Sequence, residues 1–102
     1  MLELRPTCEH CDCALPPAST DARICAYECT FCSSCVEEVL QNVCPNCGGG
    51  FVPRPIRPTG EYVKGVSLKH QPATTEVTRK PVNPEAQLAM IARIGSIPPE
   101  RR

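Results

Sequence analysis

The sequence has no tryptophan and few aromatic residues of any kind, which make up only 4% of its 102 positions. Large aliphatic residues are also scarce in the first half of the chain, where every cysteine lies. A domain of fewer than about 70 to 80 residues rarely folds on so small an apolar core without disulfides or a metal ion. The scarcity of large apolar side chains therefore predicts a fold that its cysteines hold together.

Long apolar runs and catalytic signatures are absent as well. No segment approaches the roughly 20 apolar residues of a transmembrane helix, and the first residues lack the basic and apolar regions of a secretory signal. The sequence also contains no Ser-His-Asp set, glycine-rich phosphate loop or pair of placed carboxylates. We therefore expect a cytoplasmic protein that is not an enzyme and does not bind membranes.

Cysteine, by contrast, is abundant, with nine residues that all lie at or before Cys47. An odd number leaves one thiol over in any complete disulfide framework, and disulfides are rare in reducing compartments. These observations favour metal ligands over disulfides.

Eight of the nine cysteines form four closely spaced pairs. Cys-x-x-Cys spacing lets a tight turn direct two sulfurs at one ion about 2.3 Å away, and thiolates are preferred ligands of zinc. The sequence therefore predicts two zinc ions, each bound by four thiolates. The predicted ligand pairs are Cys8 and Cys11, Cys25 and Cys29, Cys32 and Cys35, and Cys44 and Cys47.

The arrangement of these pairs resembles the RING finger. The segment Cys29-Thr-Phe-Cys32-Ser-Ser-Cys35-Val36 is similar to the RING core, and Cys44-Pro45-Asn46-Cys47 to its final pair. The resemblance covers residues 8–47 and implies a cross-brace, in which alternate pairs share an ion. One zinc would then bind Cys8, Cys11, Cys32 and Cys35, and the other Cys25, Cys29, Cys44 and Cys47. Sequential pairing is the alternative. Cys8, Cys11, Cys25 and Cys29 would then bind one ion and the other two pairs the second ion, which would give two zinc-ribbon-like lobes.

The resemblance does not extend to the positions with which RING ligases bind their conjugating enzyme. Glu9 stands where an aliphatic residue is usual, and Gly48 where a basic residue often follows the last ligand. Only Pro45 agrees, so we do not expect ubiquitin-ligase activity. The whole chain, including Arg5-Pro6-Thr7-Cys8 and Phe51-Val52-Pro53-Arg54-Pro55, also resembles a bacterial family known as a domain of unknown function. This second resemblance implies a bacterial cytoplasmic source and no particular activity.

Two residues near the first pair fall outside the eight-ligand scheme. Cys13 could replace Cys11 or Cys8 as a ligand, bridge two metals or remain a free thiol, and we expect a free thiol. We expect His10, between the two cysteines of the first pair, to point into solvent.

The fold class that follows is a small, metal-stabilised α+β domain over residues 1–52, RING-like and with one short helix. Val36, Val39, Leu40 and Val43 have the spacing of a helical apolar stripe, which Ser33 or Ser34 could cap. Residues 22–27 could form a strand. A Pro-rich extended linker, loop or disordered segment is expected over 53–82, a short helix with Asn83 as N-cap over 83–95, and a tail over 96–102.

Charge is distributed unevenly along the chain. Residues 1–48 carry two basic and seven acidic residues, a formal charge of −5, and the remainder carries +5. We therefore expect the tail to fold back over the Cys-rich half, and the helix at 84–94 to dock on it or on a second copy in a homodimer.

Three functions are compatible with this organisation. The first is a structural zinc module that serves as an adapter for an unknown protein partner, because four protein ligands leave zinc no open position. The second is nucleic-acid binding by the basic tail through Arg54, Arg57, Lys64, Lys69, Arg79 and Lys80. The third is a zinc-thiolate redox switch in which Cys13 is the attacking thiol.

Overall fold

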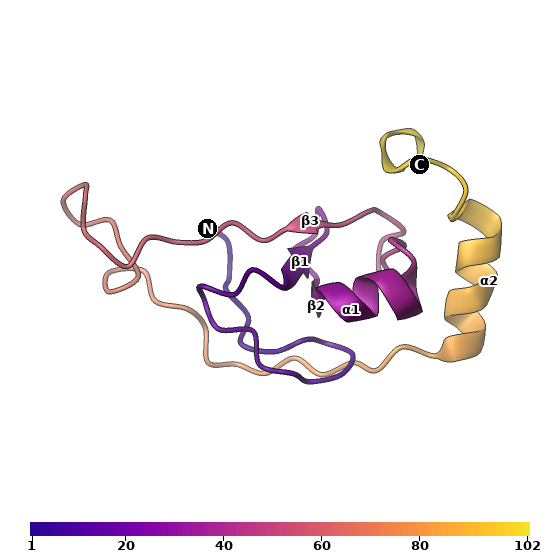
Figure 1. Ribbon diagram of the computed structural model, residues 1–102, viewed down its shortest axis with the longest axis horizontal. Coiled ribbons are helices and arrows are strands. Elements are labelled where there is room, and N and C mark those ends of the chain that lie inside the picture. The colour runs from indigo at the N-terminus through magenta and orange to yellow at the C-terminus, as the bar shows by residue number, and fades with distance from the viewer.

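A three-stranded antiparallel sheet lies at the centre of the computed structural model, which describes residues 1–102 (Figure 1). The middle strand β1 pairs with both neighbours, so that the order is β2-β1-β3. Phe31 of β2 is buried and meets Phe51 edge to face, with ring centroids 5.5 Å apart. The strands are β1 (Ala22–Ile24), β2 (Thr30–Cys32) and β3 (Val52–Pro53).

The single helix predicted in the Cys-rich half is present. Helix α1 (Ser33–Cys35) continues directly into the π-helical segment η1 (Val36–Leu40), which ends at Gln41 with a left-handed φ of 48°. Val36 and Leu40 are buried, as the apolar stripe predicted. The serine cap is wrong: Cys32, the last residue of β2, occupies the N-cap position, and no side chain caps the helix. The strand therefore leads straight into the helix without a capping residue between them.

The core is small and consists largely of cysteine. Only 18 of the 102 residues are buried, and the main cluster joins apolar residues of β1, β2 and η1 to thiols. The buried cysteines are Cys8, Cys25, Cys29, Cys32, Cys35 and Cys44. Because a thiol offers little apolar area, so small a core supplies limited hydrophobic stabilisation.

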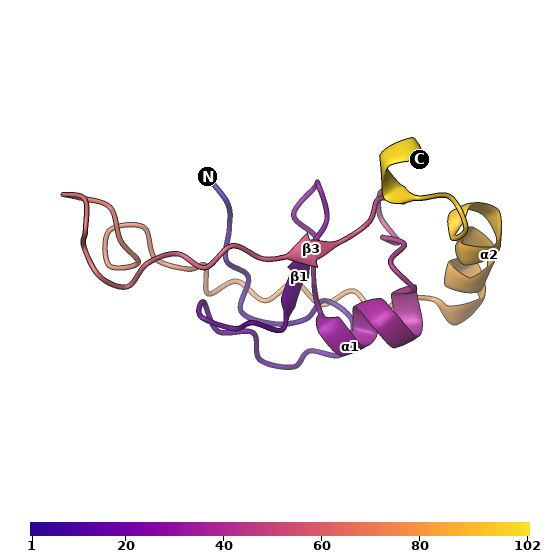
Figure 2. The same ribbon diagram turned by 45° about the horizontal axis from the view of Figure 1, so that its top comes forward.

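Residues 58–71 form an ordered, closed loop rather than a disordered segment. The Leu68 N–H donates to Pro58 O at 2.9 Å, which brings the ends of the loop together. The Gln71 side chain accepts from the Ser67 N–H at 3.2 Å and donates to Gly65 O at 3.0 Å. Arg57 anchors the loop through bonds to Gln71 O and Leu2 O, both 2.6 Å long. Figures 1 and 2 show this loop at one end of the molecule and α2 at the other.

After this loop the chain returns along the first cysteine pair, as the charge distribution predicted. The Lys80 N–H donates to Glu9 O at 2.8 Å, and the Val82 N–H donates to His10 Nδ1 at 3.0 Å. Arg79 lies 3.6 Å from an Asp12 carboxylate oxygen. The expectation that His10 simply points into solvent is therefore wrong, because its ring fastens the tail.

Helix α2 (Pro84–Ile94) has the predicted N-cap, since Asn83 Oδ1 accepts from the Ala86 N–H at 3.1 Å. Its docked face is centred on a polar residue. Leu88 is 61% exposed, whereas Gln87 is only 3% exposed and donates to Leu40 O at 3.2 Å and Val43 O at 2.9 Å. Leu40 ends η1 and Val43 follows three residues later, so the Gln87 amide joins α2 to this segment through two backbone carbonyls. A 3₁₀ turn, η2 (Pro99–Arg101), follows α2.

The molecule is elongated, with extents of 47 × 27 × 18 Å. None of its helices has the length and hydrophobicity that crossing a bilayer would require.

Candidate metal centre

The first and third cysteine pairs converge on one point. The sulfurs of Cys8, Cys11, Cys32 and Cys35 all lie within 4.8 Å of one another, and we call this set the first thiol group. The sulfurs of Cys11 and Cys32 are 3.8 Å apart. A tetrahedral zinc ion with bonds of about 2.3 Å separates its ligand sulfurs by about 3.8 Å. The donor set and its spacing therefore fit a single tetrahedral metal ion.

A second thiol group unites the fourth pair with the second. The sulfurs of Cys25, Cys44 and Cys47 lie within 4.8 Å of one another. Cys29 is outside this limit, but its backbone O accepts from the Cys25 N–H at 3.2 Å and its thiol accepts from Asn46 Nδ2 at 3.4 Å. The structure thus places three predicted ligands within reach of one ion and the fourth beside them. The sequential grouping, with Cys25 beside Cys8 and Cys11, is not the one the chain adopts.

Tight turns direct the sulfurs of each pair inward. In the first pair, Asp12 adopts a φ of 65°, and its N–H donates to Cys8 O at 3.0 Å. In the last pair, Gly48 adopts a φ of 76° and donates to Cys44 O at 2.8 Å. The Gly49 N–H then donates to the Cys47 sulfur at 3.4 Å. Such N–H donors stabilise a thiolate and orient it toward a metal ion.

The thiols differ in how readily they ionise. Burial raises the pKa of Cys8, Cys29, Cys35 and Cys44, because the charged thiolate is poorly solvated inside the protein. For Cys11, burial acts in the same direction, but hydrogen bonds from Cys13, Cys8 and Cys32 outweigh it and lower the pKa to about 7. A bound metal ion would displace the protons of the buried thiols.

Cys13 lies next to the first thiol group rather than apart from it. Its side chain is exposed, and partial desolvation together with the neighbouring thiols of Cys11 and Cys32 raises its pKa to about 12. The Cys8 N–H donates to Cys13 O at 2.9 Å, so Cys13 closes the turn that carries the first pair.

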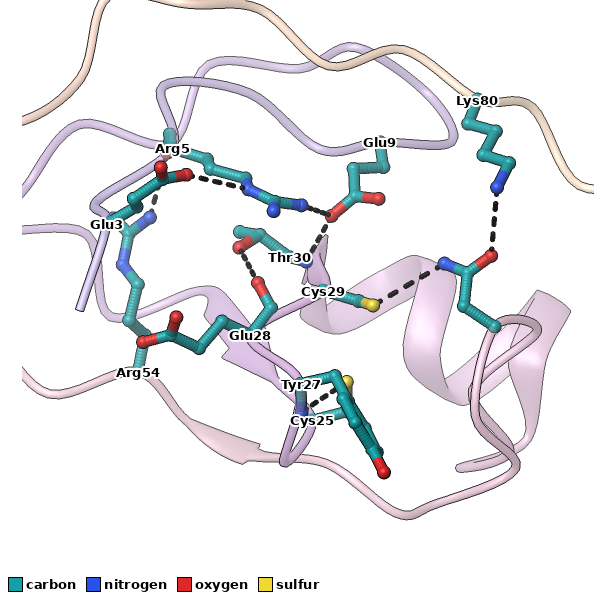
Figure 3. Close-up of polar contacts among 11 residues, drawn as sticks. Glu3, Arg5, Glu9, Cys25, Tyr27, Glu28, Cys29, Thr30, Arg54 and Lys80 are labelled. Atoms are coloured by element: carbon teal, nitrogen blue, oxygen red, sulfur yellow. Dashed lines mark hydrogen bonds and ion pairs between the residues drawn. The ribbon is translucent and has the colours of Figure 1, made fainter. Parts of the chain in front are cut away.

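Glu9, inside the first pair, ties that turn to β2. Its side chain is 3% exposed and accepts from Arg5 Nη1 at 2.7 Å and from the Thr30 N–H (Figure 3). The Glu9 N–H donates in turn to Thr30 O at 3.0 Å. Thr30 lies two residues before Cys32, so these bonds position one ligand pair against the other. The departure from the aliphatic residue usual in RING fingers thus has a structural reason, which is the pairing with Arg5.

We expect Glu9→Gln to lower the free energy of unfolding by about 1–3 kcal/mol, because it leaves the half-buried Arg5 guanidinium without its closest carboxylate. Glu3→Gln is the matched control, since Glu3 contacts the same guanidinium at 3.5 Å but its side chain is 61% exposed. Its effect should stay below about 0.5 kcal/mol. Thermal unfolding of the zinc-loaded proteins measures both. Equal effects of the two substitutions would show that the Glu9 contact has no special role.

Two of the basic residues proposed for nucleic-acid binding are engaged inside the protein, which corrects that part of the hypothesis. Arg54 is 3% exposed and donates to Arg5 O, Leu15 O and Pro16 O at 2.8, 3.1 and 3.0 Å. Arg57 anchors the 58–71 loop. Neither guanidinium is free to bind a phosphate, so the basic tail presents fewer cations than its sequence suggests.

Comparison with known proteins places the chain in a family. A family model described as "Protein of unknown function (DUF1272)" matches residues 1–57, which include all nine cysteines. "Uncharacterized protein R02474" from Rhizobium meliloti (strain 1021) is 53% identical over 81 residues, which cover 79% of this chain and 89% of that protein. No solved structure matches the chain. The predicted resemblance to a bacterial family of unknown function is confirmed.

Proposed function

Because the chain belongs to the DUF1272 family of proteins of unknown function, we propose from its own residues that it is a structural zinc-binding protein that acts as an adapter between proteins. One observation carries this proposal: four sulfurs from two distant ligand pairs lie within 4.8 Å of one another. In the second group three sulfurs, those of Cys25, Cys44 and Cys47, converge within the same distance. Two ions held in this way would fasten the four ligand segments to one another.

Zinc suits both groups, and a structural role suits zinc there. Soft thiolate ligands in a tetrahedral set select zinc over hard cations such as Mg²⁺. Four thiolates on one ion leave no position for water or substrate, which zinc catalysis requires. The grouping of pairs one with three and two with four supports a cross-brace, in which neither ion can be removed without loosening both halves of the domain. A reducing compartment such as the cytoplasm would keep the thiols available.

The adapter part of the proposal rests on the surface around α2. Grooves of about 300 and 360 Å³ flank this helix, and Gln87 and Val82 line both. Pro45, Lys80 and Met90 are among the other residues that line the first groove, and Val39 and Leu88 among those that line the second. Leu88 projects from α2 with 61% of its surface exposed, so the second groove has an apolar rim that a partner could cover.

We expect Leu88→Asp to abolish partner binding without loss of stability, because Leu88 makes few contacts within the chain. Val77→Asp is the matched control, since Val77 is also exposed, at 56%, and lies away from both grooves. Quantitative crosslinking in the native host compares both variants with the wild type. A partner that crosslinks to the wild type and to Val77→Asp but not to Leu88→Asp would support the adapter. If that partner is a second copy of the chain, the crosslinked product has the mass of a homodimer. Partners retained by Leu88→Asp, or by protein stripped of zinc, would contradict it.

A further inference from the structure

Residues 62–66, which we call the loop tip, form a small apolar surface at the opposite end of the molecule from α2 (Figures 1 and 2). Three of the nine large apolar side chains that the chain leaves exposed lie there. They are Tyr62, Val63 and Val66, with exposed fractions of 88%, 64% and 48%. Lys64 lies within this run, is exposed and forms no salt bridge. The loop tip is therefore both apolar and positively charged.

The backbone holds the loop tip in one shape. The Val66 N–H donates to Val63 O at 3.0 Å, and Gly65 adopts the positive φ of 78° that this turn requires. Ser67, which follows the tip, is 1% exposed, and its N–H donates to the Gln71 side chain at 3.2 Å. A surface that is already ordered loses little conformational entropy when it binds a partner.

The groove of about 360 Å³ beside α2 has the complementary chemistry. Its apolar lining includes Val39, Val82 and Leu88, and the one carboxylate that lines it belongs to Glu38. Glu38 is exposed and forms no salt bridge. The other groove beside α2 is lined by Lys80, which would repel a second ammonium group. The acidic groove is therefore the one that fits the loop tip.

We propose that the loop tip of one copy of the chain binds in this groove of a second copy. The tip's apolar side chains would cover the rim at Leu88, and Lys64 would pair with Glu38. This inference rests on the proposed function, because it assigns the groove described there to another copy. The molecule is 47 Å long, with the tip at one end and α2 at the other, so one copy can use both surfaces at once. Such a head-to-tail contact builds chains or rings of copies rather than a symmetric dimer.

Sedimentation equilibrium of the zinc-loaded full chain tests this contact. The tip is small beside the roughly 1,200 Å² that stable interfaces bury, so association should be weak, and the series should extend to about 1 mM protein. The mean mass of the wild type and of the control Val77→Asp should rise past that of a dimer. Tyr62→Asp and Leu88→Asp should each stay monomeric, because one lacks the tip and the other the groove. Their equimolar mixture should stop at the dimer, since one intact tip and one intact groove remain.

A monomeric wild type, or a mixture of the two variants that stays monomeric, would overturn the inference. A dimer that survives Tyr62→Asp would also overturn it, because the contact would then be a symmetric one that does not use the tip. A different partner captured by crosslinking in the host would leave the proposed function standing in these cases. A wild type without zinc would instead overturn the proposed function, so the two failures are distinguishable.

Charge reversal tests the groove assignment with exposed residues only, so that folding is not at risk. Lys64→Glu and Glu38→Lys should each raise the dissociation constant at least about fivefold at low salt, because like charges would then meet in the contact. The chain with both substitutions should recover most of the association. Glu37→Lys is the matched control, since Glu37 is also exposed on η1 but does not line this groove. No recovery in the doubly reversed chain, or an equal effect of Glu37→Lys, would overturn the inference.

Discussion

Removing zinc with a chelator is expected to unfold residues 8–47 and to release the tail in the same step. Structural zinc contributes about 10–16 kcal/mol to folding in zinc-finger peptides, which equals or exceeds the whole stability of an ordinary domain. Six of the buried core residues are cysteines, so loss of the ions would leave polar thiols where the fold needs cross-links. The apolar remainder is too small to hold the four ligand segments together.

The tail should follow because its anchors lie on the turns that carry the predicted ligands. The backbone N–H groups of Lys80 and Val82 donate to Glu9 and His10, between the two cysteines of the first pair. Gln87 donates to Leu40 O, at the end of η1. An isolated helix as short as α2, with 11 residues, is marginal in water, so it should lose its structure once these contacts are gone. Far-UV circular dichroism and limited proteolysis measure both halves of the chain. Added Zn²⁺ should restore the fold, and added Mg²⁺ should not.

Acid should produce the same unfolding through the thiols. Burial raises the pKa of Cys8 and Cys44, so in the metal-free protein protons hold these sulfurs strongly. Protons therefore compete better with zinc as the pH falls, and zinc affinity must decrease in that direction. A fold that persists after mass spectrometry has shown complete zinc loss would contradict a structural role for the metal.

How far the sequence determines the site depends on which interaction is considered. The cysteine spacing was sufficient to predict the four pairs, because a turn that directs two sulfurs at one ion is a local property of a few residues. Asn83 and Pro84 likewise predicted the start of α2, since helix caps are local. The meeting of distant pairs came from a family resemblance, because spacing alone was compatible with sequential pairing as well.

The remaining features depend on contacts between segments far apart in the chain, which produce no periodic pattern. Glu9 finds the Thr30 N–H, and Gln87 finds the carbonyls of Leu40 and Val43. Such buried polar residues look like surface residues in a sequence, and only the arrangement of the backbone shows that they have partners. The same reason explains why Arg54 was assigned to a nucleic-acid-binding surface.

Arg54→Met is expected to lower the free energy of unfolding by about 2–4 kcal/mol while leaving two zinc ions per chain. The guanidinium donates to three carbonyls on two segments that precede β1, and its backbone N–H donates to Ala22 O. Methionine fills a similar volume but has no donor, so these carbonyls would lose their partner in the interior. Burial lowers the pKa of Arg54, and its Nε atom has no partner, which moderates the loss.

Two further variants separate hydrogen bonding from loss of charge. Arg54→Lys keeps the charge but cannot reach three carbonyls with one ammonium group, so it should recover only part of the stability. Arg23→Met removes a guanidinium that donates only to Thr20 O and Ala22 O, close by in the sequence, and should cost less than about 1 kcal/mol. Denaturant unfolding of the zinc-loaded proteins measures the series. If Arg54→Met lowered the free energy of unfolding no more than Arg23→Met does, the buried guanidinium would not be what holds the first residues of the chain against β3. A role of Arg54 in binding would then have to be considered again.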